Sequence, residues 1–408
     1  MNVMASWTLQ PATNVYSTSV IARAGKDRML LATSHQLSVL TIGADEHAQP
    51  VRGVLVTTTA AGERGGAASS RIIGSDYVPA ATTPALILLL VRRELAEEAS
   101  ASAGERRVNF SLHIFGLSSS PDASPESMCR DEQLMPIPFE PWLLTHREGA
   151  GAEATAEIVI GATSGALFTF IIDENQTVRA TGGTLLSSLR GYESTLNLRS
   201  PPLTMDSKAL AAERRATAIG YADGTVLVLI EGPSQQPEVR RQVLDGPVSS
   251  LCLFSTAPES DGDAECLYLF AGGTIGTKLV FVDVLAHGWS KMVALDPGDE
   301  QAAVLCSTVV TTPLEQLQII VGTHGNALLV YDVLGDSFPL VQRKLFDEPV
   351  MGLNTATIER SGRALRASDA DAEQLFVTGL SSAHVVDYAC SESYGYFVAP
   401  GDVGGEEK

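Results

Sequence analysis

The sequence predicts an all-β protein: a seven-bladed β-propeller with long flexible loop insertions. Three observations support this fold class. One hairpin pattern recurs seven times along the 408 residues, strand-like segments flank the hairpins, and low-complexity stretches account for the extra length between them. A hydrophobic content of 45% supplies enough apolar side chains for packed blades and excludes wholesale disorder.

Each repeat is an apolar strand, a short turn that usually contains glycine, and a second apolar strand. The hairpins start at residues 29, 87, 158, 216, 267, 317 and 374, so successive starts differ by 58, 71, 58, 51, 50 and 57 residues. Propeller blades recur about every 40 to 50 residues, slightly less than this period. The hairpins are Met29–Leu40, an interrupted Ile87–Leu117, Ile158–Ile172, Ala216–Ile230, Leu267–Val284, Leu317–Val333 and Gln374–Tyr388.

Flanking segments complete four strands per repeat, which is the composition of one blade. Four of them precede hairpins: Phe139–Leu144, Val248–Ser255, Ala303–Thr311 and Val350–Ile358. Four others follow hairpins: Val51–Thr57, Pro237–Leu244, Ser290–Leu295 and Leu340–Leu345. The tight reversals need residues that tolerate positive φ, and we expect these to be the glycines of Asp223-Gly224, Gly276 and Gly325.

The ring needs an outer strand for its seventh blade, and two segments could supply it: Tyr394–Ala399 or the N-terminal Ser6–Gln10. Closure would leave no long open sheet edge. We therefore expect one propeller domain over residues 1–400 and a disordered acidic tail over 401–408. A sandwich or a two-domain all-β fold would explain the strands but not their regular grouping in fours.

Insertions rich in Gly, Ala, Ser, Pro and Glu explain the long period, because such segments cannot bury enough apolar area to fold alone. We expect them to be mobile surface loops. Within them, Arg92–Ala103 could form a short helix. The insertions are Thr58–Ser70, Arg92–Arg107, Ser118–Gln133, Gly149–Glu157 and Ala257–Glu265.

The net charge of −20 disfavours nucleic acid, which binds basic surfaces, and it disfavours adhesion to anionic lipid. The most apolar run, Ala85–Val91, has the length of a strand, whereas a membrane-spanning helix needs about 20 apolar residues. Met1–Gln10 lacks the basic patch and apolar core of a secretory signal. We therefore expect a cytoplasmic protein that neither binds nucleic acid nor inserts directly into a membrane.

No catalytic, cofactor-binding or metal-binding residues are predicted, and the protein is expected not to be an enzyme. The acidic segment Glu259–Asp263 lacks the full alternating ligand series of a calcium loop. Gly161–Gly165 has its serine one position too late for a nucleophile elbow, and Gly272-Gly273 with Gly276 opens no helix to bind phosphate. The histidines are scattered and form no H-x-x-x-H pair, which disfavours zinc: His35, His47, His113, His146, His287, His324 and His384.

Two further residue types have structural interpretations. An aspartate recurs after the third strand of three repeats, where we expect it to end the strand and hydrogen-bond the turn backbone: Asp283, Asp332 and Asp387. The five cysteines form no C-x-x-C pair, and three lie in apolar or strand-like runs: Cys252, Cys306 and Cys390. We expect reduced, buried thiols of an intracellular protein.

The C-terminal half resembles the kaptin family, the propeller subunits of the KICSTOR complex. The segments that carry the resemblance are Asp245–Val248, Leu253–Ser255, Val304–Ser307, Val321–Gly325, Leu328–Tyr331 and Leu375–Tyr388. Weaker similarity occurs at Asn14–Tyr16, Pro138-Phe139 and Ala218–Val226. Glu359–Arg363 replaces an acidic Gly-Asp-Gly turn of the family, and the chain stops soon after Tyr396 where relatives continue into a charged helical tail.

The resemblance implies a non-catalytic scaffold in an assembly that negatively regulates target-of-rapamycin complex 1 during amino-acid starvation. It implies two protein partners, a second propeller subunit with integrin-type repeats and a very large scaffold, and recruitment to the lysosomal membrane surface. The alternative that it implies is an actin-filament-binding protein of actin-rich cell edges. Acidic filaments would repel this acidic chain, although Arg214-Arg215 and Arg240-Arg241 could still dock.

Overall fold

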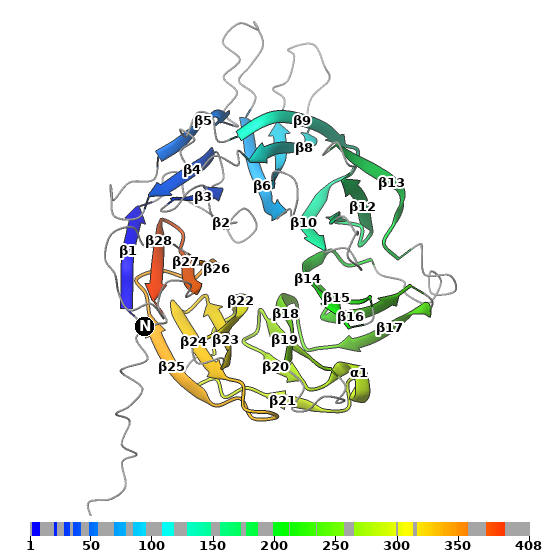
Figure 1. Ribbon diagram of the computed structural model, residues 1–408, viewed down its shortest axis with the longest axis vertical. Helices are drawn as coiled ribbons and strands as arrows, with labels where there is room; N and C mark the ends of the chain where they lie inside the picture. The colour runs from blue at the N-terminus through cyan, green and yellow to red at the C-terminus, as the bar shows by residue number, and fades with distance from the viewer. Residues whose placement is uncertain are drawn as a thin grey trace, which may run out of the picture.

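The computed structural model forms a ring of four-stranded antiparallel sheets arranged like the blades of a propeller (Figure 1). The all-β propeller prediction is confirmed. The structure describes residues 2–8, 20–22, 28–32, 36–41, 49–55, 69–78, 85–94, 108–117, 129–147, 156–172, 177–186, 199–211, 213–233, 235–256, 265–298, 301–312, 316–357 and 373–387.

Backbone pairing groups the strands of the described residues into seven sheets, six of them in chain order. The first three are β2(Val20–Ala22), β3(Arg28–Ala32), β4(Gln36–Thr41), β5(Gln49–Leu55); β6(Ser69–Val78), β7(Leu86–Glu94), β8(Val108–Leu117), β9(Cys129–Ile137); and β10(Pro141–Arg147), β11(Glu157–Ala162), β12(Leu167–Ile172), β13(Val178–Thr184). The next three are β14(Pro202–Leu210), β15(Arg214–Tyr221), β16(Thr225–Gly232), β17(Gln235–Val243); β18(Val248–Thr256), β19(Cys266–Gly273), β20(Lys278–Phe281), β21(Met292–Ala294); and β22(Val304–Thr311), β23(Leu317–Thr323), β24(Ala327–Asp332), β25(Leu340–Leu345). A four-residue helix, α1(Val284–His287), connects β20 to β21.

The last sheet joins both ends of the described chain. Its order is β1(Asn2–Thr8), β28(Ser382–Asp387), β27(Glu373–Thr378), β26(Gly352–Thr357). β1 pairs antiparallel with β28 from Asn2 opposite Asp387 to Thr8 opposite Ser382. Of the two segments predicted to close the ring, the N-terminal one therefore does so, with a strand over Asn2–Thr8 where Ser6–Gln10 was predicted. Tyr394–Ala399 lies outside the described residues, as does the predicted tail over 401–408.

The seven predicted hairpins form the second and third strands of the seven sheets, and the predicted flanking segments coincide with first or fourth strands. The second strands read as continuous apolar runs because both of their faces are covered by neighbouring blades. In β15, for example, every residue from Arg215 to Tyr221 is buried. Strand periodicity was therefore a reliable guide in this chain.

Two of the three turn predictions are confirmed. Gly224 and Gly276 adopt φ values of 86° and 85° in the turns that follow β15 and β19. The prediction for Gly325 is wrong, because Asn326 adopts the positive φ of 65° in the corresponding turn after β23. Asparagine tolerates the left-handed region better than most residues with a side chain, so the residue with positive φ can lie one position after Gly325.

Neighbouring blades pack through apolar clusters, and six such interfaces are described around the ring. The largest of them lies between β18–β21 and β22–β25 and includes Phe270, Val280 and Tyr331. In the sheet β2–β5 only the side chains of Ala32 and Leu37 are described, and both are fully buried against the sheet β6–β9. The core is thus divided into slices between blades.

Parts of the predicted insertions belong to strands, so the loop prediction is wrong at their ends. Cys129–Gln133 starts β9, Ser69-Ser70 starts β6, Glu157 starts β11, and the end of β7 includes Arg92–Glu94. Backbone pairing with neighbouring strands outweighs the polar composition of these segments. The strand over Arg92–Glu94 also contradicts the start of the predicted helix. The interiors of the insertions lie outside the described residues.

Candidate functional site at the mouth of the central channel

The first strands of four consecutive blades begin with the same irregularity. In β10, β14, β18 and β22 the pairing register shifts after the first residue, so one extra residue bulges from each strand. A β-bulge redirects a side chain and is frequent beside functional sites. The bulged residues are Trp142, Leu203, Ser249 and Leu305.

A glycine in each second strand makes room for the residue that starts the next blade. A methyl group on Gly220 would lie 2.7 Å from Val248 Cγ1, and one on Gly272 would lie 2.5 Å from Val304 Cγ1. Carbon atoms in contact are normally about 3.5–4.0 Å apart, so a side chain cannot fit there. Equivalent contacts join Gly161 to Pro202 and Gly322 to Val350.

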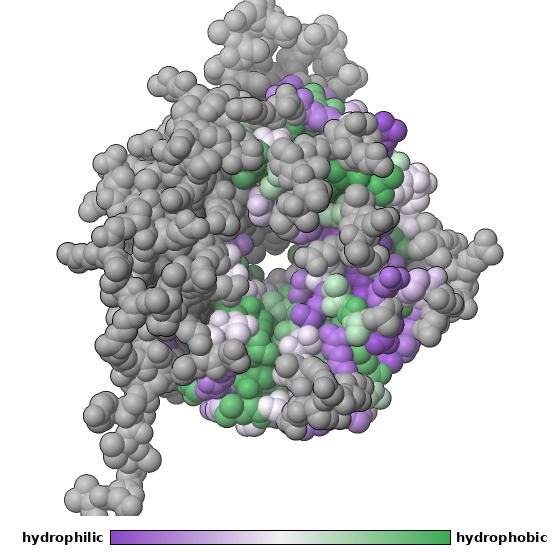
Figure 2. Space-filling view, viewed as in Figure 1, coloured by the Kyte–Doolittle hydropathy of each residue, from purple (hydrophilic) through white to green (hydrophobic). Residues whose placement is uncertain are grey.

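These glycine contacts fix where each first strand begins, and therefore where the bulged side chains lie. Met351 follows Val350 just as Ser249 follows Val248, which adds a fifth equivalent position. We call the five residues the collar: Trp142, Leu203, Ser249, Leu305 and Met351. All five line one cavity of about 330 Å³ that first strands from six sheets surround. Figure 2 shows open space at the centre of the ring.

The collar is mainly apolar and remains accessible. Trp142 is 38% exposed, and the other four side chains are partly buried. The cavity lining that the structure describes contains serine, threonine, asparagine, cysteine, glycine and apolar residues, and no Asp, Glu, Lys, Arg or His. This lining offers a surface for apolar binding and no pair of groups for acid–base catalysis.

Hydroxyl and thiol groups connect neighbouring first strands along the channel wall. Ser249 Oγ donates to the carbonyl of Val304 at 2.5 Å, and Ser250 and Ser307 share a hydrogen bond of 2.6 Å between their Oγ atoms. Cys306 Sγ donates to the carbonyl of Val350 at 3.4 Å. Such contacts hold β18, β22 and the start of β26 in a fixed relation, so the wall of the channel is preorganised.

Acidic side chains make similar connections between other blades. Asp76 Oδ1 accepts from the N–H of Tyr77, and its Oδ2 lies 2.8 Å from His146 Nδ1 on β10. Asp206 accepts from Ser207 N–H at 2.9 Å and from Leu253 N–H on β18 at 2.6 Å. Burial raises the pKa of Asp206 to about 6, although both backbone N–H groups act to lower it.

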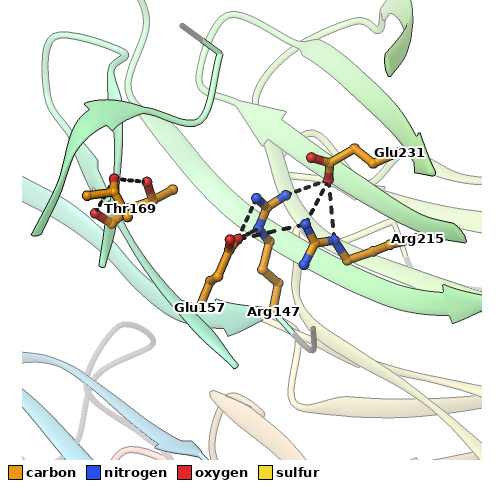
Figure 3. A network of polar contacts seen from close by, with 6 residues as sticks. Arg147, Glu157, Thr169, Arg215 and Glu231 are labelled. Carbon is orange, nitrogen blue, oxygen red and sulfur yellow. Dashed lines mark hydrogen bonds and ion pairs between the residues drawn. The ribbon is translucent and has the colours of Figure 1, made fainter. Parts of the chain in front are cut away.

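A charged network links the blades β10–β13 and β14–β17 near the opposite ends of their strands (Figure 3). Arg147 donates to Glu157 Oε2 at 2.5 Å and to Glu231 Oε2 at 2.6 Å. Arg215 Nη2 lies 3.2 Å from Glu231 Oε2 and 3.7 Å from Glu157 Oε2. Opposite charges alternate, and the Arg147 side chain is only 5% exposed. The network is a structural connection between two blades.

The structure brings one scattered histidine into a polar chain that the sequence did not reveal. Ser111 Oγ lies 3.1 Å from His113 Nε2, and His113 Nδ1 lies 2.8 Å from Glu132 Oε1. The order matches nucleophile, base and acid. Ser111 is paired within the strand β8 with both neighbours, whereas a hydrolase nucleophile lies at a turn beside free backbone N–H donors. The chain is therefore explained as sheet packing.

The glycine-rich candidates are hairpin turns, as predicted. Gly161 ends the close-packed part of β11, Ser164 is exposed in the turn, and Gly165 adopts a φ of 93°. Gly272 and Gly273 end β19, and Gly276 completes its turn. Several predicted features lie outside the described residues: the acidic segment Glu259–Asp263, the family difference at Glu359–Arg363, His35 and His47.

The recurrent aspartates do not share one role. Asp283 caps α1 by accepting from the N–H of Ala286 at 3.2 Å, as expected for a residue that ends a strand. Asp332 ends β24 as predicted, but its Oδ1 accepts from Gln318 Nε2 at 2.8 Å and not from the turn backbone. Gln318 lies opposite Asp332 in the pairing of β23 with β24, so its side-chain amide is close enough to donate to the carboxylate. The side chain of Asp387 is not described.

The cysteines in the described part of the chain are free: Cys129, Cys252, Cys266 and Cys306. Burial raises the pKa of Cys129 to about 12 and also raises the pKa values of Cys252 and Cys306. A protonated thiol is a poor nucleophile and metal ligand, which agrees with the packing role predicted for Cys252 and Cys306. Cys390 lies outside the described residues.

The described residues contain neither a potential metal cluster nor a helix that could span a membrane. Within them, no three His, Cys, Asp or Glu side chains gather closely enough to hold a metal ion. In the same part of the chain, no helix is long and apolar enough to cross a membrane.

The ring and its central channel define this protein as a β-propeller. Solved structures agree on the fold. BBS1N in its crystal structure with ARL6DN has a TM-score of 0.51 and 14% identity over 94% of this chain and 97% of that chain. The WD40 domain from Toxoplasma gondii coronin has a TM-score of 0.51 and 8% identity over 95% and 87%.

The particular family comes from sequence. Residues 102–365, more than half of the chain, match the profile described as KICSTOR complex protein kaptin, and the chain belongs to this family. This confirms the predicted resemblance, and the matched range includes every segment named for it except Asn14–Tyr16 and Leu375–Tyr388. No curated protein sequence matches the chain significantly.

Proposed function

We propose that this chain is a non-catalytic scaffold subunit of a KICSTOR-like complex that negatively regulates target-of-rapamycin complex 1 during amino-acid starvation. Membership of the kaptin family is the observation that carries the proposal. The described lining of the central cavity contains no charged side chain, which supports a binding role over a catalytic one. The proposal treats residues 1–400 as one propeller domain, followed by an acidic tail.

A scaffold needs partners, and the proposed ones are a second propeller subunit with integrin-type repeats and a very large scaffold protein. Affinity purification of the tagged chain from its own cells, followed by mass spectrometry, should recover both. Deletion should leave target-of-rapamycin signalling high after amino acids are withdrawn. A deletion strain that shuts the pathway down normally would overturn the regulatory role.

The proposed location is the cytoplasm, with recruitment to the lysosomal membrane surface through the complex. A fluorescent fusion should overlap with a lysosomal marker and should become diffuse when the very large scaffold is deleted. Lysosomal overlap that persists without that scaffold would contradict recruitment through the complex.

Direct binding to actin filaments is the alternative function, and the structure weakens its basis. Arg215 is buried against Glu231, and Arg240 donates to the carbonyls of Val284 and Leu285. Two of the four arginines that could dock on an acidic filament are therefore already occupied. We expect no co-sedimentation of the purified chain with actin filaments at physiological salt, and stoichiometric co-sedimentation would reinstate the alternative.

A further inference from the structure

We propose that the mouth of the central channel binds a linear segment of a partner protein, by inserting one large apolar side chain flanked by basic residues. The inference rests on the proposed scaffold function and names the surface and the chemistry of its partner. It is built from the collar, the cavity below it, and the charges on the connections around it.

The collar supplies the apolar part. Four of its five side chains are large and apolar, and Trp142 exposes more than a third of its surface. Exposed aromatic side chains at the centre of a recessed surface are typical anchors of protein interfaces. A charged side chain inserted here would lose hydration without gaining a described charged partner, so the lining selects an apolar group.

The cavity limits the size of the occupant. Its volume of about 330 Å³ is near the lower end of the range for ligand sites, roughly 300–1,000 Å³. It accommodates one or two side chains and excludes a folded domain. The glycine contacts and the hydroxyl bridges hold the first strands in place, so binding requires little ordering of the wall.

The charges around the mouth select the flanking residues. Strand direction places two kinds of connection on the face of the ring where the collar lies. These are the links from fourth strands to first strands and the turns between second and third strands. We call the described parts of these connections in the blades from β10 to β28 the rim. Its charged residues are six acids and one arginine: Glu140, Asp223, Asp245, Asp296, Asp347, Glu348 and Arg199.

The acids of the rim are available to a ligand. Five of the six are exposed, and Glu348 is partly buried because it accepts from Ser381 and Ser382. Among the described residues, none of the five exposed acids forms a salt bridge. An apolar centre within an acidic rim is complementary to a segment that carries lysine or arginine on both sides of an apolar residue.

Three labelled synthetic peptides of equal length test the proposal against the purified full chain by fluorescence anisotropy. One has a single phenylalanine at its centre between lysines, the second replaces the lysines with glutamates, and the third replaces the phenylalanine with serine. The first should bind, and the other two should bind at least roughly tenfold more weakly. Failure of the first peptide to bind at about 1 mM would overturn the proposal.

Variants locate the site. Trp142→Ala should weaken binding of the first peptide at least roughly tenfold, whereas Met292→Ala, at a 50% exposed apolar position on the outer strand β21, should leave it unchanged. Asp245→Asn with Asp347→Asn changes only exposed side chains and should weaken binding and its salt dependence. Binding of the first peptide that is equal in the wild type and in both site variants would overturn the proposal. The Asp245→Asn/Asp347→Asn variant keeps the test decisive if Trp142→Ala lowers stability, because it changes only exposed side chains.

Co-purification with the complex distinguishes this proposal from the function on which it rests. If the chain co-purifies with the complex but does not prefer the first peptide to the other two, the channel site is refuted and the scaffold function stands. Specific peptide binding at the collar without co-purification would refute the scaffold function and leave the channel site standing.

Discussion

Two interfaces between blades show how one geometry is stabilised in different ways. At both the β10–β13/β14–β17 and the β18–β21/β22–β25 interfaces, a glycine of one blade contacts the first residue of the next: Gly161 with Pro202, and Gly272 with Val304. Away from this contact the two differ. The former has a network of two arginines and two glutamates, and the latter has the larger apolar cluster with bridging serines. The glycine contact sets the spacing of blades, and the remainder of each interface can vary in chemistry.

Removal of one charge should have the largest effect. Arg147→Ala leaves Glu157 and Glu231 without their shortest ion pairs in a largely buried position, which should cost about 3–5 kcal/mol of unfolding free energy. Denaturant titration measures the change. Lys291→Ala is the matched control, because its pair with Asp336 is exposed and should leave the unfolding midpoint unchanged.

Replacement of the whole network sharpens the same comparison. Changing Arg147 and Arg215 to Met together with Glu157 and Glu231 to Leu should keep stability near that of the wild type, because no buried charge is left unpaired. If this variant is as unstable as Arg147→Ala, the charges contribute net stability and the two interfaces are not interchangeable.

The shared glycine contact should have the next largest effect. Gly272→Ala would place a methyl group 2.5 Å from Val304 Cγ1 and should destabilise by up to about 3 kcal/mol through overpacking. Gly182→Ala is the control, since nothing lies within 4 Å of the added methyl and only the φ of 78° opposes it. Thermal unfolding compares the two, and a smaller loss at residue 272 than at 182 would show that blade spacing is adjustable.

The smallest effect is a pH dependence at Asp206, which joins the intervening interface between β14 and β18. Its pKa of about 6 in the folded chain exceeds the ordinary value of about 3.9, so the folded state retains a proton that the unfolded state loses. As the pH rises from about 4 to about 6, this group should therefore lower stability by at most about 3 kcal/mol, with no further change above.

Asp206→Asn isolates that dependence. The amide cannot accept both backbone hydrogen bonds, so the variant should be less stable than the wild type at pH 4, and its residue 206 should contribute no pH dependence. The unfolding free energy of the variant relative to the wild type should increase between pH 4 and 6, because the wild type loses stability over that range. A difference that stays constant across that range would mean that Asp206 is ionised throughout.

The sequence was sufficient for the hairpins because the two neighbouring blades bury both faces of each second strand, which produces uninterrupted apolar runs such as the one before Tyr221. The collar was not predicted, since a bulge such as that at Trp142 depends on the register between two strands. One signal was present. Glycines 161, 220, 272 and 322 recur near the ends of second strands at intervals of 59, 52 and 50 residues.

The polar clusters were beyond the reach of sequence reasoning for a related reason. Arg147 and Glu231 are 84 residues apart in the chain, and their contact depends on how two blades face each other. Ser111 and His113 alternate along one strand in an ordinary pattern, and only the pairing with β9 adds Glu132 to them. Turn positions were predictable to within one residue, as Asn326 shows.

The pairing of β1 with β28 has a consequence for biosynthesis. Asn2 leaves the ribosome long before its partner Asp387 is made, and at about 5–20 residues per second the delay is on the order of half a minute. Throughout that interval β28 is missing, so the edge of β1 has no native partner and is open to pairing with other chains. Pairing of such distant residues also slows folding once the chain is complete. A chaperone that covers β1 during translation would therefore raise the yield of closed rings more than one that acts after release.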